Sequence, residues 1–260
     1  MATEQETGPL HELDPTGRFS DRAGDYVRFR PSYPSAAINA LLTGLGDPGG
    51  LTAADVGAGT GISTRLLADR GVRVRAVEPN AAMREAAAVH PRITWIAGTA
   101  EDTTLESRSV ELVLCAQAFH WFKPDEALAE FARILTPGGR LALMWNQRDD
   151  RDPLTHGYIE TIRRHGGEHP AETRSLDDGA IERSGVFGSV ELFKTPYEQP
   201  LGEEALLGRA RSASYVPKSG PAHERIMREL RELHRSHAGP DGIVMMKYQT
   251  VIYMAAGACA

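Results

Sequence analysis

A run of glycines between an apolar segment and a helical pattern constrains the fold of this chain most. Residues 55–65 read Asp-Val-Gly-Ala-Gly-Thr-Gly-Ile-Ser-Thr-Arg and follow the apolar run 51–56. The three glycines let the chain turn tightly with its backbone amides free, and no Cβ obstructs a close ligand. Glu78 ends the next apolar run. It lies about twenty residues on, where a doubly wound sheet places a carboxylate beside ribose hydroxyls. The pattern predicts a nucleoside-cofactor site.

Apolar and amphipathic segments alternate along the rest of the chain. Strands are predicted over 51–56, 72–77, 92–97, 109–115, 140–146, 189–198 and 243–254, and helices over 60–70, 80–89, 124–135, 154–165, 202–210 and 221–236. The alternation predicts an α/β fold with a doubly wound, mostly parallel seven-stranded sheet (Rossmann-like), an antiparallel last strand and a helical cap. Strand 243–254 is expected to pair with 189–198. Crossovers are right-handed, so the segments 55–61, 78–79, 99–101 and 115–122 should open onto one sheet edge.

Length, charge and cysteine content restrict the class of protein. A chain of 260 residues suits one large domain with additions. We divide it into an N-terminal arm with cap helices (1–48), a cofactor-binding core (49–148), and a cap insertion with the last two strands (149–260). The net charge of −6 and the pI near 5.9 argue against a general nucleic-acid binder. Two cysteines, no signal-like N-terminus and no long apolar run predict a cytoplasmic protein that avoids membranes.

The glycine spacing distinguishes between two kinds of cofactor. Dinucleotide binders use Gly-x-Gly-x-x-Gly to seat a pyrophosphate on the helix start. Here the third glycine, Gly61, comes one residue earlier. This disfavours an NAD-dependent oxidoreductase and favours S-adenosylmethionine, which carries no phosphate. Asp55, at the end of the strand, is then a partner for the cofactor's amino group or for the loop amides.

Three segments carry a resemblance to a known family. Residues 55–65 resemble the first motif of class I S-adenosylmethionine-dependent methyltransferases. The segments Tyr-Val-Arg-Phe-Arg-Pro-Ser-Tyr-Pro at 26–34 and Ala-Gln-Ala-Phe-His-Trp-Phe at 116–122 resemble the small-molecule type often described as trans-aconitate methyltransferase-like. The resemblance covers residues 19 to 146 well and the remainder loosely. It implies S-adenosyl-L-methionine as cofactor and a small-molecule methyl acceptor.

The resemblance also implies roles for individual residues at the cofactor. Asp55, Gly57, Ala58, Gly59 and Gly61 form the loop, Glu78 binds the ribose, Pro79 and Met83 flank the adenine, Thr99, Ala100 and Glu101 meet its edge, and Gln117 lies beside the methionine portion. Tyr26 and Arg30 are predicted to close over the cofactor, with Arg30 facing its carboxylate. Packing is the alternative for Met83, and packing or salt-bridging of an N-terminal helix is the alternative for Tyr26 and Arg30.

The acceptor is expected beside the exit of the fourth strand, where three aromatic residues surround His120. His120 is either the general base that takes a proton from the acceptor or a hydrogen-bonded wall of the pocket. The predicted acceptor-side residues are Tyr33, His120, Trp121, Asn146 and Tyr215. Methyl transfer from a sulfonium needs alignment and exclusion of water, and no nucleophile on the enzyme.

Two alternative functions remain besides that of a small-molecule methyltransferase. A nucleic-acid or protein methyltransferase is one, but residues 115–118 read Cys-Ala-Gln-Ala rather than the Asn/Asp-Pro-Pro-aromatic signature that holds a flipped base. A protein that binds S-adenosylmethionine without turnover is the other. The histidine pairs at 165 and 169 and at 234 and 237 are not expected to hold a metal, because they belong to no recognisable ligand set. The identity of the acceptor and the oligomeric state are not encoded in these patterns.

Overall fold

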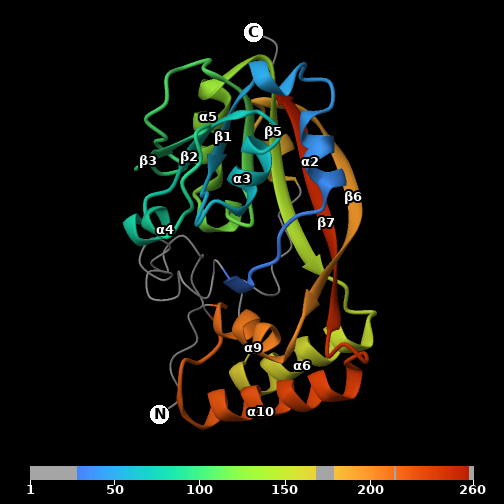
Figure 1. Cartoon of the computed structure of the whole chain (residues 1–260). Coiled ribbons are helices and arrows are strands. Elements are labelled where there is room, and N and C mark those ends of the chain that lie inside the picture. Colours follow the sequence, from blue (N-terminus) through green and yellow to red (C-terminus); the bar gives the residue numbers. More distant parts are fainter. Residues whose placement is uncertain (1–27, 168–178, 214, 258–260) are drawn as a thin grey trace.

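Among the residues that the structure describes, a seven-stranded sheet forms the centre of the protein (Figure 1). The computed structural model describes residues 28–167, 179–213 and 215–257. The strands are β1 (Thr52–Val56), β2 (Arg73–Val77), β3 (Ile93–Ile96), β4 (Val110–Ala116), β5 (Leu135–Arg148), β6 (Phe187–Leu201) and β7 (Val244–Gly257). Their order is β3-β2-β1-β4-β5-β7-β6. Strands β1 to β5 are parallel, and β7 is antiparallel to both β5 and β6. The predicted fold class is therefore confirmed.

The register places the predicted site segments at one edge of the sheet. Asp55 in β1 is the partner of Ala76 in β2 and of Leu114 in β4. Val77 in β2 is the partner of Ile96 in β3. These four strands therefore end nearly level with one another. The chain leaves all of them at the edge that faces the cap, as predicted from the handedness of the crossovers.

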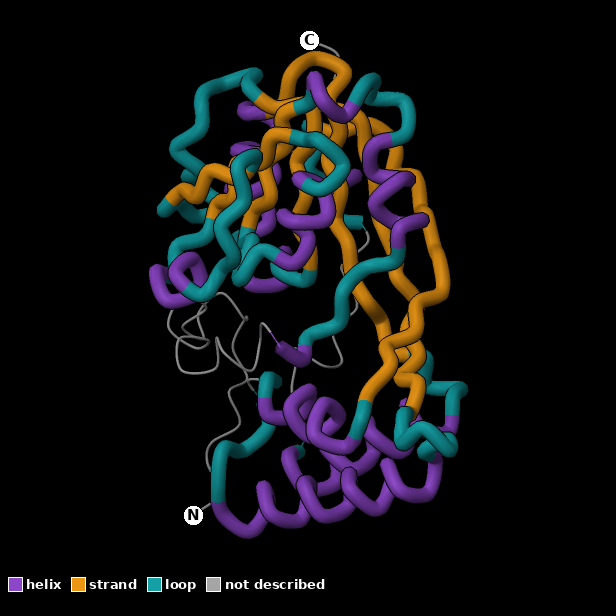
Figure 2. Tube along the Cα trace, in the orientation of Figure 1, coloured by secondary structure: helices purple, strands orange, loops and turns teal. Residues whose placement is uncertain are grey.

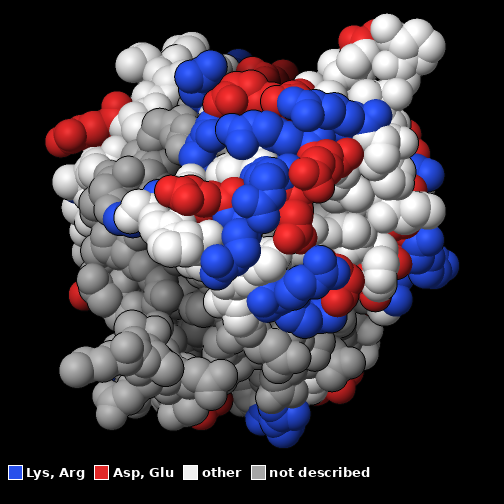
Figure 3. Space-filling model, turned by 90° about the horizontal axis from the view of Figure 1, so that it is seen from below, with Lys and Arg blue, Asp and Glu red and all other residues white. Residues whose placement is uncertain are grey.

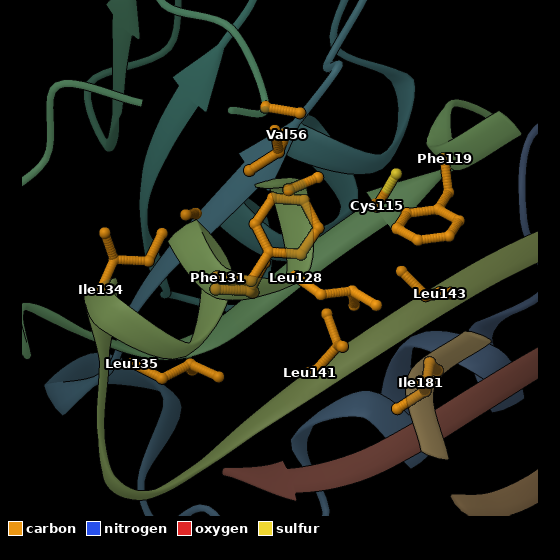
Figure 4. Close-up of a cluster of buried hydrophobic side chains, with 14 of the residues drawn as sticks. Val56, Cys115, Phe119, Leu128, Phe131, Ile134, Leu135, Leu141, Leu143 and Ile181 are labelled. Atoms are coloured by element: carbon orange, nitrogen blue, oxygen red, sulfur yellow. The ribbon is translucent and has the colours of Figure 1, made fainter. Parts of the chain in front are cut away.

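Helices cover both faces of the sheet (Figure 2). One face packs against α5 (Pro124–Ile134) and the short α8 (Ala180–Arg183) in a buried apolar cluster. Leu128 and Phe131 of α5 are fully buried, as their helical spacing predicts, and Figure 4 shows both among the side chains of the strands. The other face packs against α2 (Ser35–Leu42) and α3 (Ile62–Ala68). The two clusters hold the strand ends rigidly in place.

A third apolar cluster forms the helical cap at one end of the molecule. It is built from α6 (Pro153–Gly166), α9 (Glu203–Arg211), α10 (Gly220–His237) and the ends of β6 and β7 nearest to them. Figure 1 shows these long strands, on one side of the sheet, running from the sheet into the cap. The cap therefore sits beyond the edge at which β1 to β4 end. Our division into 1–48, 49–148 and 149–260 stays a prediction.

Several elements differ from their predicted bounds. β5 starts at Leu135, directly after α5, and continues to Arg148 because β7 pairs with it along that length. α4 (Ala81–Glu85) is shorter than the predicted helix 80–89. Pro91 disfavours helical backbone at the residue before it, and Val89 is fully exposed with no apolar surface to hold it. The two short helices η4 (Phe119–Trp121) and α8 were not predicted, since neither is long enough to show a helical period.

No helix in the described part of the chain combines the length and the apolar character needed to cross a bilayer.

Candidate active site

The glycine loop after β1 is held against the end of β2. Gly57, Gly59 and Gly61 have φ of 70°, 58° and 78°. These values lie in the left-handed region that glycine adopts without steric cost. The backbone amides of Gly57 and Ala58 both donate to the carbonyl of Val77, at 2.9 and 3.1 Å. The loop therefore keeps one conformation relative to the acid that follows β2.

Gly57 also permits a close approach between the β1 and β4 exits. A Cβ built on Gly57 would lie 2.6 Å from the Cβ of Ala118 and 2.9 Å from Cζ of Phe122. Both contacts are far inside van der Waals distance. The segment after β4 can reach the loop after β1 only because residue 57 has no side chain.

Glu78 binds the glycine loop through its carboxylate. Oε2 accepts the backbone N–H of Gly59 at 2.9 Å, and Oε1 accepts the backbone N–H of Asn80 at 2.9 Å. The side chain is buried, and this burial raises the pKa of Glu78 against the lowering effect of the two hydrogen bonds. Each carboxylate oxygen can accept a further hydrogen bond. The fixed carboxylate can therefore receive a pair of vicinal hydroxyls beside the loop.

Asp55 is a fully buried acid at the end of β1. Its Oδ2 accepts the hydroxyls of Ser63 at 2.7 Å and Thr64 at 2.6 Å, while Oδ1 has no hydrogen-bond partner among the described residues. Burial raises the pKa of Asp55 to about 6, against the two hydroxyl hydrogen bonds that lower it. A buried acceptor without a partner is rare. Oδ1 can therefore accept a hydrogen bond from a donor that the described residues do not supply.

The segment after β3 forms a tight turn. The amide of Thr99 donates to the carbonyl of Asp102 at 3.0 Å, and the amide of Asp102 donates to Oγ1 of Thr99 at 3.1 Å. Ala100 is buried, and Oε1 of Glu101 accepts the backbone N–H of Lys123 at 3.0 Å. This last bond ties the β3 exit to the β4 exit. The predicted adenine-edge residues therefore lie on a rigid turn next to the fourth strand.

Pro79 and Met83 follow Glu78 along the chain. Pro79 is exposed, and its carbonyl accepts a hydrogen bond from Nη1 of Arg84 at 2.8 Å. Met83 is 3% exposed in the first turn of α4. Pro79 presents free apolar surface at the sheet edge, whereas Met83 is enclosed by the protein. Their roles beside adenine stay predictions.

Gln117 leaves β4 with an unusual backbone. Its φ of 59° is in the left-handed region, which non-glycine residues adopt at a cost. Its amide donates to the carbonyl of Met144 at 2.9 Å, and its Nε2 contacts the carbonyl of Asn146 at 3.4 Å. Residues in such conformations cluster at functional sites. The sequence does not predict this strain, because glutamine has no preference for the left-handed region.

Asn146 joins three parts of the chain. Its Nδ2 donates to the carbonyl of Ser32 at 2.8 Å, and its Oδ1 accepts the hydroxyl of Thr250 at 2.6 Å. These bonds connect β5 to β7 and to the segment that precedes α2. The side-chain amide of Asn146 is thus engaged by the protein itself, and its predicted contact with the acceptor stays a prediction.

His120 and Trp121 are half-buried in η4, with ring centroids 5.2 Å apart. Phe119 has a different position from the one expected beside the histidine, because it is 3% exposed and belongs to the core cluster shown in Figure 4. Phe122 packs edge-on against Phe131 of α5. Two of the three aromatics thus anchor the segment, and Trp121 is the one that accompanies His120.

Of the other predicted residues, Arg30 and Tyr215 lie on the cap side of the sheet edge. Tyr33 is buried in the apolar cluster with α2. Arg30 donates from Nη2 to the carbonyl of Ser212 at 3.0 Å, and the hydroxyl of Tyr215 accepts from Nη2 of Arg148 at 2.7 Å. Tyr26 lies outside the described residues. The structure thus brings the loop, the acid and the β4 exit together at one edge, with Arg30 and Tyr215 on the cap side.

Sequence reasoning missed two groups of residues. Ser63 and Thr64, which hold Asp55, follow the glycines directly, so their spacing on α3 could have indicated them. A second set lies in and beside the cap and left no such signal: Tyr158, Arg209 and Tyr248, which are buried, and Arg148, which is half-buried. In the described residues no cluster of three or more possible metal ligands occurs.

The fold and the site at this sheet edge define a protein with a doubly wound sheet that binds a nucleoside cofactor. The comparisons with known proteins identify its family. A family model described as a methyltransferase domain matches residues 54–143. An uncharacterized methyltransferase of Mycobacterium bovis is 36% identical over 239 residues, covering 90% of this chain and 93% of that protein. An uncharacterized methyltransferase-like protein of Schizosaccharomyces pombe is 30% identical over 240 residues, with the same coverage.

A solved structure supports the same assignment. A protein of Anaeromyxobacter dehalogenans, named as a candidate type II methyltransferase, superposes with a TM-score of 0.65 and 28% identity, covering 89% of this chain and 98% of that one. The chain belongs to the class I S-adenosylmethionine-dependent methyltransferases.

The residues present fit this cofactor on structural grounds. The carboxylate of Glu78 is fixed beside the glycine loop, where a ribose diol can meet both oxygens. The orphaned Oδ1 of Asp55 suits a cationic amino group nearby. Each role for an individual residue remains a prediction.

Proposed function

We propose that the protein transfers a methyl group from S-adenosylmethionine to a small-molecule acceptor by in-line displacement. The proposal rests on the two hydrogen bonds that Glu78 accepts from the backbone amides of Gly59 and Asn80. They hold its carboxylate at the position where a doubly wound sheet binds ribose. When bound, the cofactor supplies an electrophilic methyl group on a sulfonium. The protein's task is to orient the two reactants and to exclude water.

The residues divide this task between them. Glu78 would bind the ribose, Thr99, Ala100 and Glu101 the adenine edge, and Asp55 with Gln117 the methionine portion. His120 and Trp121 would border the acceptor, with His120 as proton acceptor or as wall. The core 49–148 would hold the cofactor, and the segments on either side would cover the acceptor.

The surface of the cap supports a small acceptor. Figure 3 shows acidic and basic side chains interspersed over the cap's outer face. Many of them are paired, as Arg164 and His165 are with Glu229. Nucleic-acid binders carry a continuous basic face instead. We therefore place the acceptor beneath the cap rather than on its surface.

Calorimetric titration and a turnover assay test the proposal. We expect S-adenosylmethionine and S-adenosylhomocysteine to bind with one-to-one stoichiometry, and NAD to show no heat of binding. Methyl-labelled S-adenosylmethionine, incubated with a metabolite extract, should then label a low-molecular-weight product. Binding without any labelled product would show a protein without turnover, and binding of NAD alone would refute the cofactor assignment.

A further inference from the structure

The cap contains a buried guanidinium for which the described residues supply no hydrogen-bond partner at two of its nitrogens. Arg209 of α9 is 4% exposed. Its Nε and Nη1 are buried and have no hydrogen-bond partner in the described part of the chain. Arginine stays charged at any physiological pH, so it cannot escape burial by losing its proton. A buried charge without a partner is strongly unfavourable. The side chain therefore has room for a partner that the described residues do not supply.

A second guanidinium and several tyrosines surround it. Arg148 of β5 lies with its Cζ 5.2 Å from the centroid of the Tyr158 ring and donates to the hydroxyl of Tyr215. The hydroxyl of Tyr158 is fully buried and also lacks a hydrogen-bond partner in the described residues. Arg209, Arg148 and these tyrosines are close enough to shift one another's pKa values. The cluster thus holds two positive charges and hydroxyl donors from four parts of the chain.

Six carboxylates of the cap and of the loop before α6 pair with other side chains. Asp149 pairs with Arg151, Asp152 with Lys247, Glu160 with Arg163, Glu203 with Arg231 and Arg235, Glu204 with Arg211, and Glu229 with Arg164 and His165. No ion pair to Arg209 occurs among the described residues, and the groups that face it are Tyr248, Tyr158, Arg148 and Tyr215. Within the described part of the chain, Arg209 therefore has hydroxyl groups and a second positive charge around it but no anionic partner.

Its position connects it to the predicted acceptor side. Arg148 lies two residues after Asn146 on β5, a distance of about 7 Å along a strand. Asn146 is in contact with Gln117 at the β4 exit. Ser212, three residues after Arg209, accepts the hydrogen bond from Arg30. An extended metabolite reaching from the β4 exit into the cap would meet Arg209 and Arg148.

We propose that Arg209 and Arg148 form a binding site for an anionic head group, a carboxylate or a phosphate, of the methyl acceptor. The planar guanidinium donates two parallel hydrogen bonds to either group, and the buried hydroxyl of Tyr158 supplies a further donor. This inference deepens the proposed function and rests on it. It makes the acceptor an anionic metabolite whose charged group is separated from the methylated atom by several bonds.

Anion titrations of the full-length protein test the site. The probes are succinate, benzoate, inorganic phosphate and pyrophosphate, each compared with sodium chloride at equal ionic strength, with and without saturating S-adenosylhomocysteine. We expect at least one probe to raise the melting temperature of the wild type above the sodium chloride value. Arg209→Met should abolish this gain and weaken binding at least tenfold by calorimetry. A response to carboxylates alone or to phosphates alone identifies the head group, and either supports the site.

Two controls keep the result interpretable. Arg231→Met removes a half-exposed arginine that pairs with Glu203, and it should keep the full anion response. Arg209→Met should melt no lower than the wild type without anions, since it removes a buried charge that has no partner. The site is refuted if no probe exceeds sodium chloride in the wild type, or if Arg209→Met responds as the wild type does. Binding of S-adenosylhomocysteine, measured in parallel, separates a failure of the cofactor assignment from a failure of this site.

Discussion

Replacing Gly57 by alanine tests whether the contact between the β1 and β4 exits requires a missing side chain. The new Cβ would lie 2.6 Å from the Cβ of Ala118 and 2.9 Å from Cζ of Phe122, and the backbone φ is 70°. The left-handed backbone costs an alanine about 1–2 kcal/mol. Overpacking adds about 1–3 kcal/mol. We therefore expect Gly57→Ala to lower the free energy of unfolding by about 2–5 kcal/mol.

Gly138 provides a matched control for the backbone contribution. Its φ is 77°, but a Cβ there would meet nothing within 4 Å. Gly138→Ala should thus cost only the backbone share, about 1–2 kcal/mol. The assay is urea unfolding followed by far-UV circular dichroism, with near-UV measurements to check that the two transitions coincide. If the two variants lose the same free energy of unfolding, within about 0.5 kcal/mol, the steric argument is refuted. A loss of stability in Gly138→Ala alone would also contradict it.

Three further predictions concern the acids and the histidine of the site. The pKa of Asp55 is raised to about 6, above its ordinary value of 3.8, so its contribution to stability is present below pH 3.8 and is lost as the pH rises through 6. Relative to Asp55→Asn, the wild type should lose roughly 2 kcal/mol of unfolding free energy between pH 4.5 and 7.5, measured by urea titration at each pH; a constant difference would contradict the shifted pKa. Glu78→Gln removes the charge and one acceptor for the loop, so calorimetry should show S-adenosylmethionine binding weaker by about 2–3 kcal/mol, roughly 30- to 150-fold. Glu111→Gln is the control, because the carboxylate of Glu111 accepts the amide of Thr52 at the opposite end of the sheet. This variant should bind S-adenosylmethionine as tightly as the wild type does, and equal losses of affinity in both variants would point to a general effect. His120→Gln should leave the affinity for the cofactor unchanged and lower the rate of methyl transfer. If the histidine takes a proton, the rate should fall by about 100-fold or more and one limb of the pH-rate profile should disappear; if it is only a wall of the pocket, the rate should fall by less. Weakened cofactor binding with normal turnover would contradict both roles.

The sequence predicts which segments meet at one edge of the sheet, because the determining interactions are local. The glycines, the acid after the second strand and the ends of the strands follow from short patterns of backbone freedom and apolar periodicity. The observed register then brings Asp55, Glu78 and Gln117 to one edge. The position of Leu128 and Phe131 against the sheet follows in the same way from helical spacing.

Features that depend on distant pairing could not be predicted in this way. β5 continues past Asn146 into polar residues because β7, about a hundred residues later, supplies a partner. Phe119 enters the core although it lies beside His120 in the sequence. Such outcomes depend on which surfaces meet, and local periodicity does not contain that information.

Arg209 illustrates the limit most clearly. It lies on α9, which also carries Glu203, Glu204 and Arg211, and such a mixture of charges is typical of a solvated helix. Packing of α6, α10 and β7 against α9 buries it instead. Only the tertiary structure shows that its guanidinium is enclosed without an acid from the described residues, so local sequence patterns could not indicate the proposed anion site.

The central claim is that Glu78 holds the ribose of S-adenosylmethionine beside the glycine loop. A crystal structure of the complex with S-adenosylhomocysteine tests it most directly. We predict both ribose hydroxyls within hydrogen-bond distance of the Glu78 carboxylate, about 2.5–3.0 Å between oxygen atoms. A nucleoside bound elsewhere, or a ribose turned away from Glu78, would contradict the account.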